Sequence, residues 1–367
     1  MKRIICYSLL LILVLACAKT ETVSSNVKAK RVFDAWLQMT YPDAYNNGPQ
    51  GWGWYYNPHP AKEVPGTGKP VADSAWVQVR FTAWNMGGMI VESSEERPHR
   101  QIGDYVSYNY YGPVVWHKAD AAALPAGLRN LLLDMNIGGK RQAFVPGWLN
   151  STSNYSSAQE YFNDSENAGS ALMYDIEIVD ATNDITRWGV DSLVRYVGHH
   201  PVCPYAKSNG DVPAGKARFV RCPESSKDTT NLGFWYQCLK EPDKVKSWPA
   251  DTIVYVDYVG RRLDGTVFDT SIRDTARKYD LYSSSATYSP MKMRIASVFY
   301  DSKMISTSDG SESSLINGFT YAVKQMKPGE WGVTLFHQGM GYAQSSQATI
   351  PAYSPLLFEL RLVDAPQ

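Results

Sequence analysis

A four-part internal repeat is the feature of this 367-residue sequence that most restricts its fold. The first half contains GWGWYYNPHPAKEVPGTGKPV (51–71), VQVRFTAWNMGGMIVESS (77–94), GLRNLLLDMNIGGKRQAFVP (127–146) and MYDIEIVDA (173–181). The second half answers with GFWYQCLKEPDKVKSWPAD (233–251), VYVDYVGRRLDGTVFDTS (254–271), GFTYAVKQMKPGEWGVTLFH (318–337) and LFELRLVDA (357–365). Because four matched blocks in one order are unlike chance similarity, we expect two similar domains.

Each block has the pattern of a defined element. VQVRF and VYVDY alternate with the period of two that is typical of half-buried strands, as do MYDIEI and LFELRL. The sequences MGG and LDG that follow the first pair offer glycine for turns. In the third block of the second half, a stripe at three- and four-residue spacing predicts a docked helix, namely Ile316, Phe319, Ala322, Val323 and Met326. Pro328 and Gly329 should end that helix.

These patterns predict an α+β chain with two domains, each a bent antiparallel β-sheet wrapped around a short amphipathic helix. We expect the domains at 47–182 and 228–367, with an insert at 183–227 between them. Residues 18–46 should form a linker and a helix (26–46), with Val32, Trp36 and Met39 on one side. In the insert, 186–200 could form a helix, with Trp188, Leu193, Val194 and Val197 as its apolar residues.

The first 17 residues have the pattern of a secretory signal. Lys2 and Arg3 precede an apolar run that is too short to span a bilayer. The run ends in Val14-Leu15-Ala16-Cys17, which looks like a bacterial lipobox with Cys17 as the lipidated residue. A plain signal peptide with an incidental cysteine is the alternative. We therefore expect an exported protein, tethered by a lipid to the periplasmic or surface face of a bacterial cell-envelope membrane.

Composition and the remaining motifs exclude several classes of site. The chain has 36 basic and 36 acidic residues, so it lacks the excess positive charge that is typical of proteins that bind nucleic acid. Aromatic residues make up 13%, which suits exposed aromatic clefts. His199, His200 and Cys203 match no standard metal spacing, and no G-x-S-x-G motif occurs. We expect no metal and no cofactor.

Three cysteines lie beyond Cys17, and an exported protein permits a disulfide. Cys203–Cys222 is the favoured pair because both residues lie in the insert, although the sequence leaves the pairing open. Cys238 falls within the strand pattern FWYQCL and is more simply read as a small buried residue.

An ordered series of residues in the second half carries a family resemblance. The series is Tyr258, Phe268-Asp269, Arg273, Leu315-Ile316, Phe319, Tyr342, Ile350-Pro351 and Phe358. It resembles the FKBP-type peptidyl-prolyl cis-trans isomerases. The resemblance implies catalytic roles for Tyr258, Asp269 and Tyr342, with Arg273 as a partner for the carboxylate. It implies substrate binding by the other members, Phe268, Arg273, Leu315, Ile316, Phe319, Ile350 and Phe358. Core packing is the alternative reading for Ile316 and Phe358.

The chain departs from the family pattern at several places. In the second half, Ala343 replaces a glycine, His337 replaces a proline, and segment 274–313 is long and could reshape the cleft rim. In the first half, Phe81, Val91-Glu92 and Leu128 stand at the positions of Tyr258, Phe268-Asp269 and Phe319. The polar stretch 150–170 occupies the place of the later motifs. We therefore read the first domain as degenerate.

The resemblance implies an isomerase for X-Pro bonds, and the partners would be proline-containing segments of other exported proteins. The alternative is a non-catalytic surface lipoprotein that uses such domains as binding modules for polypeptides.

Overall fold

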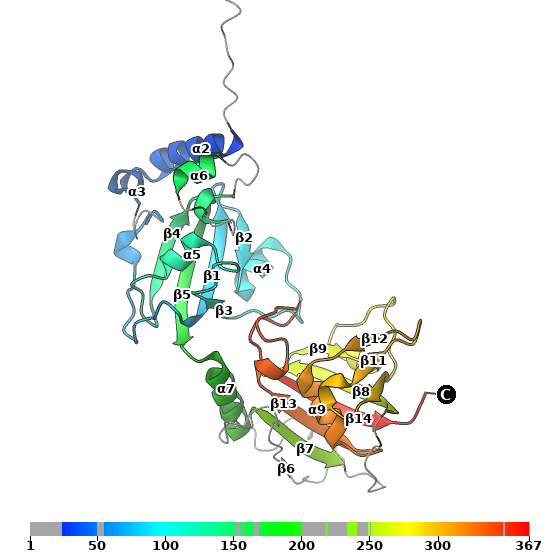
Figure 1. Cartoon of the computed structure of the whole chain (residues 1–367). Coiled ribbons are helices and arrows are strands. Elements are labelled where there is room, and N and C mark those ends of the chain that lie inside the picture. Colours follow the sequence, from blue (N-terminus) through cyan, green and yellow to red (C-terminus); the bar gives the residue numbers. More distant parts are fainter. Residues whose placement is uncertain are drawn as a thin grey trace, which may run out of the picture.

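The computed structural model describes residues 24–49, 55–151, 155, 157–163, 169–199, 217–218, 233–240, 249, 251–347 and 349–366. It contains two antiparallel sheets and a few short helices, which confirms the α+β class (Figure 1). The N-terminal sheet holds β1 (Trp76–Asn85), β2 (Ile90–Ser93), β3 (Val114–His117), β4 (Lys140–Val145) and β5 (Leu172–Thr182). Its strand order is β2-β1-β5-β4, and β3 also pairs with β1.

The C-terminal sheet is larger. It holds β6 (Ala217–Arg218), β7 (Phe234–Lys240), β8 (Thr252–Arg262), β9 (Val267–Thr270), β10 (Met291–Ile295), β11 (Lys303–Ile305), β12 (Glu312–Ser314), β13 (Trp331–Phe336) and β14 (Leu356–Val363). Their order is β12-β11-β10-β8-β14-β13-β7-β6, with β9 paired to β8. Strands β11 and β12 come from the long segment between β10 and α9 and extend this sheet beyond the plan of the first.

The helix α9 (Asn317–Gln325) fills the concave side of the C-terminal sheet, as the apolar stripe predicted. Phe319, Ala322, Val323 and Met326 are almost fully buried in one core cluster. The helix ends at Gln325, slightly before the expected stop, and Met326 is its extended C-cap residue. The shorter α5 (Ala126–Leu131) holds the corresponding place on the N-terminal sheet.

The internal repeat is visible in the topology. The order β1, β2, α4 (Glu96–Ile102), β3, α5, β4, β5 in the first half corresponds to β8, β9, α8 (Arg273–Lys278), β10, α9, β13, β14 in the second. The register agrees as well, since Ala83 pairs with Glu92 and Gly260 pairs with Asp269. Positions 92 and 269 are therefore equivalent in the two sheets.

The N-terminal helix differs from the prediction. It consists of α2 (Ser25–Thr40) and α3 (Pro42–Asn47), because Pro42 starts a new helix. The side that carries Val32, Trp36 and Met39 does not face the core, since Val32 is 57% exposed and Met39 85%. The buried pair is Phe33 and Leu37, whose four-residue spacing sets the true face. Trp36 flanks this face and contacts Phe144 edge-on at 4.9 Å.

The helix α7 (Ile185–His199) joins the two sheets and confirms the helix expected in the insert. Leu193 is fully buried in a cluster with residues of β7, β13 and β14, so α7 covers the outer face of the C-terminal sheet, whereas Val194 is 48% exposed. The Gln338 amide donates a 2.6 Å hydrogen bond to the carbonyl of Ile185, which fixes the start of α7. The connector is thus partly integrated into the second half.

Two cysteine predictions have different outcomes. Cys238 is buried in β7, as expected of a small core residue. Cys203 and Cys222 lie outside the described residues, as does the lipobox with Cys17. Across the described ranges, no helix is long and apolar enough to cross a bilayer.

One further α-helix and four short 3₁₀ turns complete the described elements. A helix α6 (Ala158–Asn163) lies beside α2 in the first half. Short 3₁₀ turns are η1 (Pro60–Lys62), η2 (Gly147–Leu149), η5 (Phe299–Asp301) and η6 (Gln338–Met340). The last of these directly follows β13 and leads into the loop that carries Tyr342.

Candidate active site

A cluster of aromatic rings lies where β8, β9, β14 and α9 meet. The Phe358 ring contacts Phe319 at 5.3 Å and Phe268 at 5.6 Å between centroids, each in an edge-to-face arrangement. Tyr258 stands edge-on to Phe319 at 5.8 Å. Gly260 makes this closeness possible, because a Cβ there would lie 2.6 Å from the Phe268 ring. Phe319 and Phe358 are buried, whereas Tyr258 and Phe268 are half-buried and face the cleft.

Tyr258 and Asp269 form a hydrogen-bonded pair beside these rings. The Tyr258 hydroxyl donates to Asp269 Oδ2 at 2.8 Å, and the Thr270 amide donates to Oδ1 at 2.8 Å. The two strands are held in register by Ser271, whose Oγ accepts the Tyr258 amide at 2.9 Å. Burial raises the pKa of Tyr258, and the Asp269 charge raises it further. The phenol therefore stays protonated and keeps donating to the carboxylate.

Tyr342 follows η6 and reaches the same cluster from the loop between β13 and β14. It is half-buried, and its pKa is raised by burial and then by the nearby Asp269 charge. In the part of the chain that the structure describes, its hydroxyl has no hydrogen-bond partner. A protonated, unpaired phenol at the edge of an apolar cleft can donate to a carbonyl oxygen of a bound molecule.

The aliphatic members of the predicted series lie around the same core. Leu315 and Ile316 are half-buried just before α9, and Ile316 is its N-cap residue. Ile350 is 3% exposed and so belongs to the floor more than to the cleft surface. The structure thus brings together nine of the ten predicted residues around one aromatic core.

Arg273 is the exception. It is the exposed first residue of α8, and among the described residues no ion pair or hydrogen bond joins it to Asp269. The expectation that Arg273 holds the carboxylate is wrong, since Tyr258 and the Thr270 amide already supply its partners. Arg273 follows Asp269 by only four residues in the sequence, but at the start of α8 it is exposed to solvent.

An open cavity of about 460 Å³ lies against Tyr258, Phe268 and Asp269. Its other wall comes from segment 274–313, which contributes Leu281, Ala286–Pro290 and Met304–Thr307 among others. This long segment therefore forms the rim of the cleft. Its Ser- and Tyr-rich sequence gives the rim a more polar surface than the aromatic floor.

Two residues of this region were missed from the sequence. Phe336 in β13 stacks on Phe358 at 5.8 Å with nearly parallel rings, and the alternation in WGVTLF was the available signal. Glu330 is fully buried, where it accepts the Tyr236 hydroxyl at 2.6 Å and the Lys327 amide at 2.9 Å. It ties the turn after α9 to β7, and nothing in the sequence pattern marked it as buried.

The N-terminal sheet has a corresponding but different cleft. A cavity of about 790 Å³ is lined by Phe81, Trp116, Leu128 and Tyr174, with the Glu92 carboxylate at the position of Asp269. Burial raises the pKa of Glu92. Phe81 has no hydroxyl to pair with it, and the Tyr174 hydroxyl donates instead to Asn150 at 2.8 Å. This cleft keeps a carboxylate but lacks the Tyr–Asp pair of the C-terminal half.

In the described parts of the chain, no group of three or more His, Cys, Asp or Glu side chains is placed to hold a metal ion.

A comparison with known protein families matches the part of the chain that contains this cleft. Residues 245–363 match the family FKBP-type peptidyl-prolyl cis-trans isomerase, so the C-terminal part of the chain contains a domain of that type. No curated protein sequence matches the chain.

Solved structures provide two further similarities. The crystal structure of the three FKBP domains of wheat FKBP73 is 15% identical and covers 81% of this chain and 90% of that one, with a TM-score of 0.28. A peptidyl-prolyl cis-trans isomerase from Pseudomonas syringae pv. tomato is 19% identical and covers 51% of this chain and 99% of that one, also with a TM-score of 0.28.

Proposed function

We propose that the FKBP-type domain at 245–363 catalyses the cis-trans isomerisation of X-Pro bonds at the cleft formed by Tyr258, Asp269 and Tyr342. The observation that carries this proposal is the hydrogen-bonded Tyr258–Asp269 pair beside the unpaired Tyr342 hydroxyl, set over the rings of Phe268, Phe319 and Phe358.

The chemistry of the reaction suits these groups. Rotation about a peptide bond has a barrier of about 18–20 kcal/mol, which arises from amide resonance. The planar amide is more charge-separated than the twisted one, so moving it from water onto aromatic surfaces favours the twisted state. The rings would hold the proline, and the Tyr342 hydroxyl would donate to the carbonyl oxygen of the substrate. Catalysis is then preferential binding of the twisted amide, without a nucleophile or cofactor.

The test is an exchange measurement on the full-length chain. A peptide with one X-Pro bond is mixed with the protein, and its cis-trans exchange is followed by NMR, which needs no coupling protease. We expect exchange to accelerate in proportion to protein and to saturate with peptide. Uncatalysed exchange at saturating peptide would contradict the proposed activity.

A binding function is the second candidate. The 790 Å³ cavity of the N-terminal sheet favours it, because aromatic residues line this cleft although it lacks the Tyr–Asp pair. This candidate predicts that the same peptide binds in a calorimetric titration while its exchange rate stays at the uncatalysed value. Activity that is lost on Tyr342→Phe would favour the isomerase instead.

We further propose that the protein acts outside the cytoplasm, on proline-containing segments of other exported proteins, while held to a bacterial envelope membrane by a lipid on Cys17. The support is the sequence Val14-Leu15-Ala16-Cys17 after a short apolar run.

A further inference from the structure

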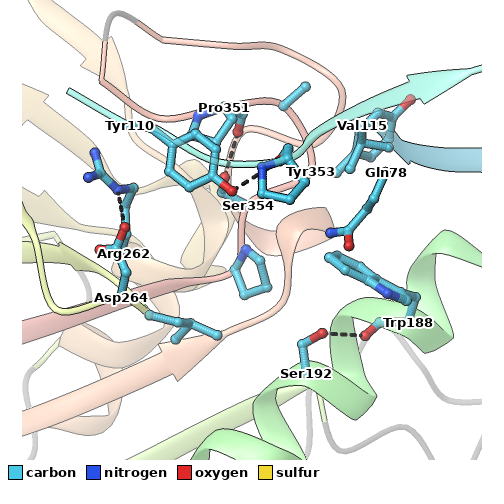
Figure 2. Close-up of a pocket in the computed structure, with 14 residues that line it drawn as sticks. Gln78, Tyr110, Val115, Trp188, Ser192, Arg262, Asp264, Pro351, Tyr353 and Ser354 are labelled. Carbon is cyan, nitrogen blue, oxygen red and sulfur yellow. Dashed lines mark hydrogen bonds and ion pairs between the residues drawn. The ribbon is translucent and has the colours of Figure 1, made fainter. Parts of the chain in front are cut away.

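Arg262, the last residue of β8, connects the two halves of the molecule. It is 4% exposed. Its Nη1 donates to the carbonyl of Thr349 at 2.5 Å and to that of Tyr108 at 3.1 Å, and its Nη2 donates to Asn109 at 3.1 Å. Asp264 accepts from Nε at 3.1 Å (Figure 2). One guanidinium therefore bonds both a loop of the C-terminal half and a segment of the N-terminal half.

The loop that Arg262 holds is the one that carries the proposed site residues. This loop is the connection between β13 and β14, in which Tyr342 is followed directly by the segment 343–353, with Ile350 next to the bonded Thr349. The two ends of segment 343–353 are joined by a hydrogen bond from the Tyr353 amide to the Ala343 carbonyl at 2.7 Å. Ala343 and Tyr353 have left-handed backbone angles, with φ of 50° and 60°, which residues other than glycine adopt at an energetic cost. The loop thus has a fixed base, and Arg262 fixes its far part.

The segment from the N-terminal half is equally well defined. Residues 107–110 lie between α4 and β3. The Ser107 hydroxyl donates to Asp280 at 3.3 Å, and the Tyr110 ring lies 5.4 Å from the Arg262 guanidinium. The Tyr110 hydroxyl donates to the Pro113 carbonyl at 3.0 Å, which holds the ring in place. Tyr110, Pro351 and Tyr353 all line a cavity of about 260 Å³, which Figure 2 shows in close-up.

The other side of the loop also faces the N-terminal half. Gln344, Ser345, Ser346, Pro351, Ala352 and Tyr353 form one wall of the 790 Å³ cavity of that sheet. In Figure 1 this orange-red loop lies at the junction of the two sheets. The arrangement around Arg262 requires both halves: without residues 108–109, two of the acceptors of a buried guanidinium would be missing, which is costly for a buried charge.

We propose that Arg262 is a positioning residue, through which the N-terminal half holds the loop that carries Tyr342 and Ile350 in its active arrangement. The catalytic part of this inference rests on the proposed isomerase function. The degenerate half of the repeat would then serve the reaction as a support for the loop and not as a second catalytic site.

The first test compares two neighbouring arginines in the full-length protein. Arg262→Lys keeps the charge but cannot reach several carbonyls at once. Arg261→Lys is the matched control, because the Arg261 guanidinium is also buried but bonds Glu359 and Gly265 of its own half. Hydrogen exchange is measured at the Ser345, Gln347 and Tyr353 amides, which are bonded within the loop. Exchange should accelerate in Arg262→Lys and not in Arg261→Lys. Equal exchange in the two variants would overturn the inference.

The second test changes only the N-terminal half. Tyr110→Leu removes the ring beside Arg262 without altering the FKBP-type domain, so it keeps the inference testable if Arg262→Lys fails to fold. We expect faster exchange of the same loop amides, and a kcat/KM for X-Pro isomerisation lowered by about threefold or more through misplacement of Tyr342. Unchanged exchange in Tyr110→Leu would refute the support role. A wild-type chain without isomerase activity would refute the proposed function alone, since the hydrogen-exchange measurement at the loop amides needs no catalysis.

Discussion

At the scale of single residues, the proposed role of the Tyr342 hydroxyl as a hydrogen-bond donor to the substrate can be tested directly. Tyr342→Phe removes one hydroxyl and keeps the ring against the core. A hydrogen bond of this kind contributes about 0.5–1.5 kcal/mol net. With about 1.4 kcal/mol for each factor of ten, kcat/KM should fall roughly threefold to tenfold. The measurement is the NMR exchange assay, with thermal melts alongside to show that folding is unchanged.

The carboxylate provides the partner experiment and its control. Asp269→Leu should lower kcat/KM at least as much as Tyr342→Phe, because it also leaves the Tyr258 hydroxyl without its acceptor. Arg273→Ala should behave as wild type, since Arg273 is exposed and does not contact Asp269. If Tyr342→Phe and Asp269→Leu both melt and isomerise normally, the cleft is not the site.

His337 should make stability depend on pH. Burial lowers its pKa from the ordinary 6.5, and its Nδ1 accepts the Gly339 amide at 3.2 Å, which only the neutral ring can do. Below pH 6.5 the unfolded chain binds a proton that the folded chain resists, so stability falls as the pH decreases towards the folded pKa. Chemical unfolding across this range should show the decline in wild type and a weaker one in His337→Asn. Parallel curves for the two proteins would contradict this assignment.

At the scale of elements, the packing of β14 on α9 makes Phe358 a determinant of stability. Its ring contacts Phe268, Phe319 and Phe336, so Phe358→Ala would leave a large cavity in the core. We expect the free energy of unfolding to fall by about 3–5 kcal/mol. Val91→Ala in β2 is the control, because Val91 is 54% exposed and its loss should change stability by less than about 0.5 kcal/mol. The measurement is denaturant titration of both variants. Equal unfolding midpoints for Phe358→Ala and Val91→Ala would contradict the role of Phe358 in the core.

The strands and α9 could be predicted because each shows one face to the core. The alternation in VYVDY and the stripe ending in Met326 report burial directly, and both are confirmed. The face of α2 could not be read in the same way. Apolar residues occupy both its sides, and only the packing of Phe33 and Leu37 against Phe144 selects one. The pairing of β11 with β10 and with β12 also lacks a sequence signal, because these strands are short and partly polar.

The candidate site was predictable in its aromatic part for a similar reason. Tyr258, Phe268 and Phe358 lie on paired strands, whose register follows from the alternation and the turn between β8 and β9. Arg273 was misjudged because its direction depends on how α8 leaves β9, which no local pattern specifies. Phe336 was missed because the alternation in WGVTLF indicates only that the residue is buried and does not distinguish a ring of this cluster from ordinary core.

At the scale of the whole molecule, the proposed lipid anchor on Cys17 would decide where the protein acts. Cys17→Ala removes the thiol that would be acylated, and acyl chains provide the apolar attachment to a bilayer. We expect the variant to leave the membrane fraction or to retain its uncleaved signal, as seen by fractionation and mass of the product. Processing and membrane association identical to wild type would contradict the lipoprotein proposal.

The contact that joins the two halves has a consequence for how the sequence can diverge. Arg262 bonds the main-chain carbonyls of residues 108 and 109 and not their side chains. Substitutions at those two positions can accumulate without breaking the contact, provided that the backbone keeps its path, whereas position 262 has no such freedom. Across related chains, the mark of this junction would then be a single retained arginine facing a segment of drifting sequence, a pattern that a search for co-varying pairs would overlook.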